Sequence, residues 1–316
     1  MSKRSRGNLK LSYDQEKTVQ SAMNTTLLGR MERRYLDLLS SSLRDTMHSF
    51  DPPLTPLEFH QAELTRARVA EEFREEIEAL RKKEPTDDPE DRRLREILLD
   101  PNLAWVISFL RVNRRASHTL LHPEALESLQ RCILEVIENG IPGDLMECGV
   151  YKGGACIYMR GVLEALEEKE RKVWVADSFA GLPEPDRKKS LKDAVVHSYL
   201  REVGSFQVTL DSVRGSFAAY DLLDRQVKFL PGWFNESLPG FSRPLALLRC
   251  DADWYDSTVD VLENLYQQVS PGGIVIIDDY APLFGAYQAV NEFRQRHNVT
   301  APLVQVHDAV HFWRKP

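Results

Sequence analysis

Hydrophobic and polar positions follow two different rhythms along the chain, and the change comes near residue 120. Before it, apolar residues recur at the three- and four-residue spacing of an amphipathic helix. This spacing predicts helices over Met31–Leu43 and from Thr55 to just before Pro85, and a further apolar helical patch over Leu94–Leu110. Residues 1–30 are polar without a sustained period, so we expect them to be mobile.

The start of the longer helix carries a capping signal. Thr55 is placed to act as N-cap, Pro56 fits the first helical position, and Glu58 completes a capping box three residues after Thr55. Beyond this helix, the acidic stretch Glu84–Asp91 contains two prolines. Charge runs of this kind are usually solvated, so the stretch is predicted to be an exposed linker.

From Pro123 onward, segments with the period of a helix alternate with short apolar runs typical of buried strands. The predicted strands cover 144–149, 172–177, 227–230, 245–251 and 273–278, with a closing hairpin at 303–306 and 310–313; the predicted helices cover 123–139, 154–168, 206–220, 257–269 and 287–297. Such alternation predicts an α/β fold with a doubly wound, mostly parallel sheet and a C-terminal antiparallel hairpin. We therefore divide the chain into residues 1–30, a helical N-terminal extension at 31–119, and an α/β domain at 120–316.

Composition and charge narrow the classes of function. With 42% hydrophobic and 28% charged residues, the 316-residue chain resembles a soluble globular protein. A net charge of −7 argues against general nucleic-acid binding, which depends on neutralising phosphates. No apolar run is long enough to span a membrane, and no signal-peptide pattern follows the basic first residues. We expect a cytoplasmic protein without nucleic-acid or membrane partners, and the amphipathic N-terminal helices favour a homo-oligomer.

The four cysteines, Cys132, Cys148, Cys156 and Cys250, lie in apolar runs and form no CxxC pair. This distribution favours buried, reduced thiols over a zinc site or a disulfide framework.

The first predicted strand ends in a glycine-rich turn. In a doubly wound sheet, ligands bind beyond the carboxyl ends of the strands, and glycines allow a ligand to approach the backbone closely. Gly149, Gly153 and Gly154 match neither GxGxxG nor a P-loop, and Glu147 supplies a negative charge. The turn therefore suits an ammonium group or a positive sulfur better than a pyrophosphate. A tight turn beside a solvated carboxylate would explain the same residues.

Asp177 ends the second predicted strand, about 30 positions after the glycine turn. A carboxylate at this place can accept hydrogen bonds from both hydroxyls of a ribose. Together with the glycine turn, it favours an adenosine-containing cofactor.

Four carboxylates follow two further strands: Asp251 and Asp253 after one, Asp278 and Asp279 after the next. Crowded acids repel one another and are costly to bury without a counter-charge. A hard divalent cation removes that cost, and a ligand set of oxygens favours Mg²⁺. If strand geometry continues to Asp253, its side chain points the same way as that of Asp251. The alternative is that acids here cap the following helix, with Asp256 or Ser257 as its cap.

Other candidates carry weaker signals. His197 lies in the polar stretch from Asp186 to Ser205, which is predicted to be a lid. The pairs Trp233–Phe234 and Trp254–Tyr255 follow strands, where an aromatic ring can either stack on a cofactor base or pack in the core.

Five ordered blocks resemble the macrocin O-methyltransferase family. They are Gly143–Ala155 (GDLMECGVYKGGA), Val173–Pro183 (VWVADSFAGLP), Val227–Leu238, Leu248–Thr258 (LRCDADWYDST) and Ser270–Tyr280 (SPGGIVIIDDY). The resemblance covers roughly residues 120–316. Tyr151–Lys152 stands where the family usually has Trp–Arg, and Cys250–Ala252 where Leu-Asp-Gly is common. These differences remove no chemical group that the reaction needs, but they leave the identity of the substrate open.

The resemblance implies a Rossmann-like methyltransferase fold. It also implies transfer of the methyl group of S-adenosylmethionine, with Mg²⁺, to a hydroxyl of a small acceptor, often on a sugar of a natural product. By the family's motifs, Glu147 and Gly149 lie by the methionine end of the cofactor, Asp177 holds the ribose, and Gly232 and Trp233 border the adenine. The implied cofactor-binding set is Glu147, Gly149, Val150, Gly153, Gly154, Asp177, Ser178, Phe179, Gly232, Trp233 and Asp251. The implied metal ligands are Asp251, Asp278 and Asp279, and the implied general base is Asp253, with His197 as the alternative base.

Two rival functions remain at this point. A nicotinamide-dependent oxidoreductase can be built on a related sheet, although the absent GxGxxG counts against it. A catalytically silent protein could use the N-terminal helices to recruit a partner, although the four crowded carboxylates would then have no chemical use.

Overall fold

The computed structural model describes residues 29–44, 55–99, 101, 117–201, 206–307 and 309–316. The predictions for residues 1–28 and for most of the Leu94–Leu110 patch lie outside these ranges. Among the described helices, none combines the length and the apolar character that crossing a bilayer requires.

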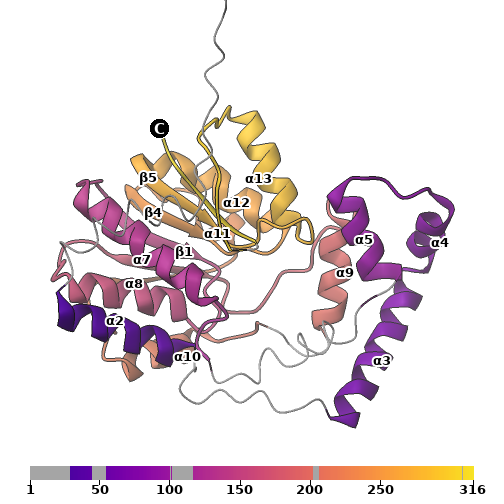
Figure 1. Cartoon of the computed structure of the whole chain (residues 1–316), viewed down its shortest axis with the longest axis horizontal. Helices are drawn as coiled ribbons and strands as arrows, with labels where there is room; N and C mark the ends of the chain where they lie inside the picture. Colours follow the sequence, from indigo (N-terminus) through magenta and orange to yellow (C-terminus); the bar gives the residue numbers. More distant parts are fainter. Residues whose placement is uncertain (1–28, 45–54, 100, 102–116, 202–205, 308) are drawn as a thin grey trace, which may run out of the picture.

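A seven-stranded sheet forms the centre of the molecule, in the order β3-β2-β1-β4-β5-β7-β6 (Figure 1). The strands are β1 (Asp144–Cys148), β2 (Val173–Asp177), β3 (Val227–Pro231), β4 (Leu245–Cys250), β5 (Val269–Ile277), β6 (Val304–His307) and β7 (Val310–Arg314). The first five are parallel, and β7 runs antiparallel to both β5 and β6. This confirms the predicted doubly wound sheet with its C-terminal hairpin. We call the sheet and the helices that cover it the sheet domain.

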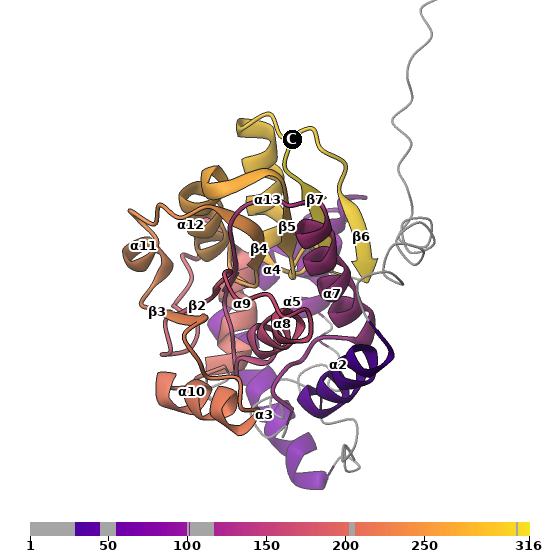
Figure 2. The ribbon, with the colours of Figure 1, turned by 90° about the vertical axis from the view of Figure 1, so that its left-hand side faces the viewer.

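Each face of the sheet is covered by its own helices and has its own apolar cluster (Figure 2). One face packs against α2 (Arg30–Leu43), α7 (Pro123–Glu138), α8 (Gly154–Ala165) and α10 (Leu210–Ala219). The other face packs against α11 (Phe234–Ser237), α12 (Tyr255–Leu265), the 3₁₀ turn η3 (Tyr266–Gln268) and α13 (Gly285–Arg296). Because both faces are covered, the central strands β1 and β4 are buried along their whole length. All four cysteines are buried and unbridged, as the sequence predicts.

A second helical unit lies to one side of the sheet (Figure 1). It consists of α3 (Pro56–Glu72), α4 (Arg74–Lys82), α5 (Pro89–Leu99) and α9 (Leu191–Leu200), and we call it the cap. Its members share a third apolar cluster, which also includes Trp254 of the sheet domain. The cap therefore joins two segments about a hundred residues apart in sequence, and its core is continuous with the chain that follows β4.

Three details of the cap differ from the prediction. The long helix is interrupted at Phe73, whose φ of −110° and ψ of 28° separate α3 from α4, while the predicted capping box between Thr55 and Glu58 is present. Helix α5 begins inside the predicted linker, with Pro89 as its first residue. The polar stretch from Asp186 to Ser205 contains α9, because Val195, Val196 and other apolar residues at helical spacing are buried against α3 and α5 despite the charged flanks.

The helices before residue 119 do not form one unit. Helix α2 packs on α8 through Leu36, Leu39 and Leu43, and a Cβ added to Gly161 would lie 2.3 Å from Leu39. Helices α3 to α5 pack instead on α9. The domain boundary at residue 119 stays a prediction, but the packing assigns α2 to the core of the sheet domain.

This packing leads to a first prediction. Leu36 is 1% exposed and Leu38 is 62% exposed, although both lie in α2. Leu36→Ala should lower the free energy of unfolding by about 2–5 kcal/mol, because it leaves a cavity between α2 and α8. Leu38→Ala should change it by no more than about 0.5 kcal/mol. Chemical denaturation followed by circular dichroism measures both, and similar small effects would show that α2 is dispensable to the core.

Candidate functional site

A cavity of about 520 Å³ opens at the carboxyl ends of the parallel strands. The cavity lies between β1 and β4, where the strand order reverses. From β1 the sheet extends to β2 and β3 on one side, and from β4 it extends to β5 on the other. Its volume falls within the range of roughly 300–1,000 Å³ that is usual for small-ligand sites. Residues of the cap, among them Asp193, Val196 and Leu200, form part of its wall.

The structure brings most of the predicted site residues together around this cavity. Those that line it are Glu147, Gly149, Val150, Asp177, Ser178, Trp233, Asp251, Asp253, Asp278 and Asp279. The other predicted residues, Gly153, Gly154, Phe179 and Gly232, are not among its lining residues. They lie in the turns that hold the lining residues in place.

The glycine turn after β1 is required by the protein's own packing. Gly149 has a φ of +88°, and a Cβ there would lie 1.7 Å from the carbonyl oxygen of Asp251. The N–H of Asp251 also donates to the carbonyl of Cys148, at 2.9 Å. Glycine therefore allows the chain after β4 to pass directly beside the chain after β1, which brings Asp251 next to the glycine turn.

Asp177 fastens the same turn from the neighbouring strand. Its carboxylate accepts hydrogen bonds from the N–H groups of Val150 and Phe179, both at 2.8 Å. Burial raises the pKa of Asp177, and hydrogen bonds from Val150, Phe179 and Ser178 partly oppose this. Since a carboxylate has about four acceptor sites, these bonds leave capacity for a hydroxyl donor of a ligand in the cavity.

Glu147 and Arg249 face each other across the two central strands. They are paired in the parallel register of β1 and β4, so their side chains lie on the same face of the sheet. Both are almost fully buried, at 1% and 2% exposure, and they form an ion pair. The second oxygen of Glu147 accepts a hydrogen bond from the thiol of Cys156, at 2.8 Å.

Arg249 also binds two of the predicted metal ligands. Its guanidinium lies 2.8 Å from Asp251 Oδ2 and 2.5 Å from Asp278 Oδ1. Burial alone would lower the pKa of Arg249, but the surrounding carboxylates raise it well above its ordinary value. A permanently charged guanidinium thus holds three acids from three strand ends in one place.

The carboxyl groups of Asp251, Asp278 and Asp279 can place one oxygen each within 4.8 Å of one another. Burial raises the pKa of each, to about 6 for Asp278, although Arg249 opposes the shift at Asp251 and Asp278. Together with Glu147 and Asp253, five carboxyl groups gather near a single guanidinium. One guanidinium does not balance this charge, and the geometry of the three aspartates fits a further cation.

Asp253 reaches the cavity by a different route from the predicted one. Strand β4 ends at Cys250, and Asp253 has a φ of +55°, so strand geometry does not continue to this residue. Its N–H donates to Asp279 Oδ2 at 3.2 Å, which ties the chain after β4 to the chain after β5. Burial, followed by the nearby acids, raises the pKa of Asp253 well above its ordinary value.

The alternative explanation of these acids as helix caps is wrong. Helix α12 begins at Tyr255, with Trp254 as N-cap, and no side chain of the N-cap residue caps it. Asp256 lies inside the first turn of α12, and its side chain forms an ion pair with Lys189, just before α9, at 2.6 Å.

The remaining candidates occupy separate places. His197 does not line the cavity; its ring meets Trp254 edge-on at 6.2 Å between centroids, and burial lowers its pKa. Trp254 also lines the cavity, but it is 1% exposed, donates from Nε1 to the carbonyl of Pro183 at 3.0 Å, and belongs to the apolar core of the cap. Trp233, in contrast, is partly exposed to the cavity from the end of β3.

Sequence reasoning missed three parts of the site. The segment His118–Leu121 lines the cavity, where the carbonyl of His118 accepts from the N–H of Gly154 at 3.0 Å. Nothing in its sequence marks it. Arg249 could have been found, since it stands two residues before Asp251 on the same strand face. Asp193, buried in α9, was hidden because no helix was predicted there.

Comparison with known proteins identifies the lineage. A family model described as Macrocin-O-methyltransferase (TylF) matches residues 32–315, most of the chain. The chain belongs to the macrocin O-methyltransferase family. The prediction of an O-methyltransferase is thereby confirmed, over the oxidoreductase and the catalytically silent alternatives.

Relatives of known activity cover about two thirds of the chain. It is 44% identical over 199 residues to the 8-demethyl-8-(2,3-dimethoxy-alpha-L-rhamnosyl)-tetracenomycin-C 4'-O-methyltransferase of Streptomyces olivaceus, a match to 63% of this chain and 76% of that protein. It is 42% identical over 203 residues to the mycinamicin III 3''-O-methyltransferase of Micromonospora griseorubida, covering 63% and 79%. Among solved structures, the O-methyltransferase NovP is 37% identical with a TM-score of 0.60, covering 67% of this chain and 98% of that one.

Arg249 gives a second prediction. Arg249→Met should lower the free energy of unfolding by about 3–5 kcal/mol, because the buried Glu147 and the partly buried Asp251 and Asp278 lose their shared counter-charge. Arg243→Met is the control: it removes an ion pair with Asp144 from a side chain that is 58% exposed, and should cost no more than about 1 kcal/mol. Denaturant titrations of both variants at neutral pH measure the difference. An equally mild effect of both changes would contradict the role assigned to Arg249.

Proposed function

We propose that this family member transfers the methyl group of S-adenosylmethionine, with the help of Mg²⁺, to a sugar hydroxyl of a glycosylated natural product. The observation that carries the proposal is the trio Asp251, Asp278 and Asp279, gathered in the cavity beside the glycine turn. It supports a reaction in which the methyl donor and an activated hydroxyl meet at one strand edge.

The cofactor-binding half of the cavity is proposed to lie over β1, β2 and β3. Asp177 would accept a hydrogen bond from the ribose, since its bonds from Val150, Phe179 and Ser178 leave acceptor capacity. Trp233, which lines the cavity after β3, would border the adenine. Glu147 and Gly149 would lie by the methionine end, where the carboxylates favour positively charged groups. S-adenosylmethionine, when bound, supplies a methyl carbon made electrophilic by its positive sulfur.

Mg²⁺ is proposed to be held by Asp251, Asp278 and Asp279. The set consists only of carboxylate oxygens, and it carries more negative charge than Arg249 balances. Mg²⁺, when bound there, would lower the pKa of an acceptor hydroxyl in contact with it. Ion pairs with Arg249 hold Asp251 and Asp278 in place, so these two carboxylates would need little rearrangement.

Asp253 is the proposed general base. It lines the same cavity and is bonded through its backbone to Asp279, but it is not one of the three clustered ligands. Its carboxylate would therefore be free to take the hydroxyl proton, while Asp251, Asp278 and Asp279 would hold the metal. Much of the rate should come from holding oxygen, carbon and sulfur in line, which the rigid strand ends favour.

The acceptor is proposed to bind between the strand ends and the cap. The names of the two relatives specify methyl transfer to a defined oxygen of a natural product. The tetracenomycin named for the first relative carries a dimethoxy-rhamnosyl sugar. In this chain, Leu182, Val196, Leu200, Phe206 and Phe284 give the cap side of the cavity an apolar wall. Such a wall suits the apolar body of a natural product, with its sugar directed toward the acids. A homo-oligomer and a cytoplasmic location remain predictions.

The experiment that tests this proposal is a methylation screen. The purified protein is incubated with S-adenosylmethionine, Mg²⁺ and a panel of glycosylated natural products that carry free sugar hydroxyls, with their aglycones as matched controls. We expect mass spectrometry to show the gain of one methyl group on the sugar of at least one glycoside, and loss of the product when a chelator is added. Methylation that persists in the chelator would contradict the metal role, and methylation of aglycones alone would contradict the acceptor class.

With an acceptor in hand, two isosteric changes separate the roles of the acids. Asp278→Asn keeps one oxygen for the metal, so its rate should fall but recover in part with excess Mg²⁺. Asp253→Asn cannot accept the proton, so turnover should fall by about 10²–10⁴-fold and added Mg²⁺ should not restore it. Rates measured across a Mg²⁺ titration distinguish the two patterns. Normal turnover of the Asp253→Asn enzyme would place the base elsewhere.

A further inference from the structure

One buried carboxylate of the cap reaches across to the sheet domain. Asp193 lies in the first turn of α9, and its side chain is fully buried. Its two oxygens accept hydrogen bonds from two different backbone N–H groups: Oδ2 from Tyr255 and Oδ1 from Gly285, each at 2.7 Å. Asp193 thus connects three helices that are far apart in sequence.

The two donors are the first residues of α12 and α13. In both helices the N-cap residue, Trp254 or Phe284, provides no side-chain hydrogen bond to the first turn. Free N–H groups and the helix dipole make each of these ends favourable for a negative charge. Asp193 therefore supplies, from another part of the chain, a cap that neither helix has of its own.

The segments just before these helices carry the acids proposed above as metal ligands and general base. The chain from β4 to α12 contains Asp251 and Asp253, and the chain from β5 to α13 contains Asp278 and Asp279. The N–H of Ala286 also donates to the carbonyl of Asp253, at 3.3 Å. Holding the starts of α12 and α13 together thus restrains both segments at their far ends, while β4 and β5 restrain them at their near ends.

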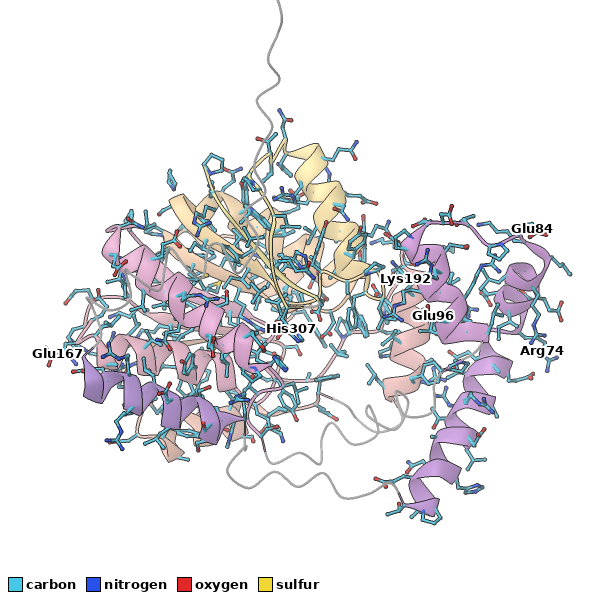
Figure 3. The ribbon with its side chains drawn as sticks, viewed as in Figure 1. Arg74, Glu84, Glu96, Glu167, Lys192 and His307 are labelled. Carbon is cyan, nitrogen blue, oxygen red and sulfur yellow. The ribbon has the colours of Figure 1, made fainter. Side chains whose placement is uncertain are left out.

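Two neighbouring features indicate that this connection is built closely. A Cβ on Gly285 would lie 2.1 Å from Asp193 Oδ2, so the carboxylate occupies the space of a side chain at that position. Lys192, labelled in Figure 3, lies beside it and donates from Nζ to Glu90 of α5 at 2.7 Å and to the carbonyl of Pro282 at 3.0 Å. The adjacent residues Lys192 and Asp193 of α9 therefore both form hydrogen bonds with the chain at the start of α13.

We propose that Asp193 is a positioning residue that couples the cap to the metal-binding acids. When α9 packs in its observed position, the carboxylate of Asp193 fixes the distance between the β4–α12 and β5–α13 segments. It thereby fixes the spacing of Asp251, Asp278 and Asp279. The same helix carries Val196 and Leu200, which line the cavity, so an acceptor that presses on the cap also bears on the metal site. This inference rests on the proposed Mg²⁺ role of the three aspartates.

The test compares Mg²⁺ binding in three variants, none of which alters a proposed ligand. Asp193→Asn has the same shape but presents an amide N–H₂ to one of the two donors, so only one bond can remain. Gly285→Ala inserts a methyl group against the carboxylate from the other side. Ser198→Ala is the matched control, because Ser198 is buried in the same helix but bonds only within the cap, to Arg68 and Glu72.

Calorimetry with Mg²⁺, on protein saturated with S-adenosylhomocysteine, gives the affinity. We expect Mg²⁺ binding to weaken about tenfold or more in Asp193→Asn and Gly285→Ala, the effect of losing one hydrogen bond to a charged group. Ser198→Ala should bind Mg²⁺ like the wild type, even if its melting temperature falls as much. S-adenosylhomocysteine affinity should change less than about twofold in all three, since that half of the cavity lies over other strands.

Amide hydrogen exchange supplies a readout that does not depend on the metal. The N–H groups of Tyr255 and Gly285 should exchange faster in Asp193→Asn and keep wild-type rates in Ser198→Ala. Wild-type Mg²⁺ affinity in Asp193→Asn, despite faster exchange at these two amides, would overturn the coupling and reduce Asp193 to a structural tie. If the wild-type protein itself binds no Mg²⁺, the proposed metal role fails instead, and the coupling fails with it.

Discussion

The structure depends on one buried guanidinium. Five carboxyl groups converge at the end of the sheet, and burying so much like charge without compensation would cost far more than a domain's net stability. Arg249 reduces this cost because it pairs with acids from β1, β4 and β5 at once. The price is that Arg249 must itself be buried, which is tolerable only while all three partners stay in place. The arrangement therefore ties the geometry of the site to the integrity of the fold.

The same interaction explains why we propose a further cation at this site. A single positive charge can hold several acids together but cannot neutralise them all. Burial raises the pKa of each clustered aspartate, so these acids hold their protons more tightly than they would in water. A divalent ion offers the missing charge in a form that also binds a hydroxyl. The fold thus stores a charge imbalance that the proposed reaction uses.

Much of this could be predicted from the sequence. The alternation of helical and strand-like hydrophobic patterns predicted the sheet. The positions of Asp177, Asp251 and Asp278 at strand ends predicted that they surround one cavity, because parallel strands present their carboxyl ends at one edge. The conformation at Asp253 could not be predicted, since its positive φ depends on the neighbouring segment and not on a local motif. Nor could Asp193 be assigned a role. Its two partners are backbone groups 62 and 92 residues away, and backbone donors leave no mark on the sequence.

The composition of the cap has a consequence for how the chain is made. Among the residues that the structure describes, the apolar cluster of helices α3 to α5 is completed by α9 and Trp254. During synthesis, about a hundred further residues must leave the ribosome before α9 appears, which at typical rates takes on the order of 5–20 s. Throughout that interval Val69, Phe73 and Ile77 would lack their final partners. The nascent protein therefore passes through a stage that chaperones can recognise, and its yield in the cell should be more sensitive to translation speed between α5 and α9 than to the stability of the finished fold.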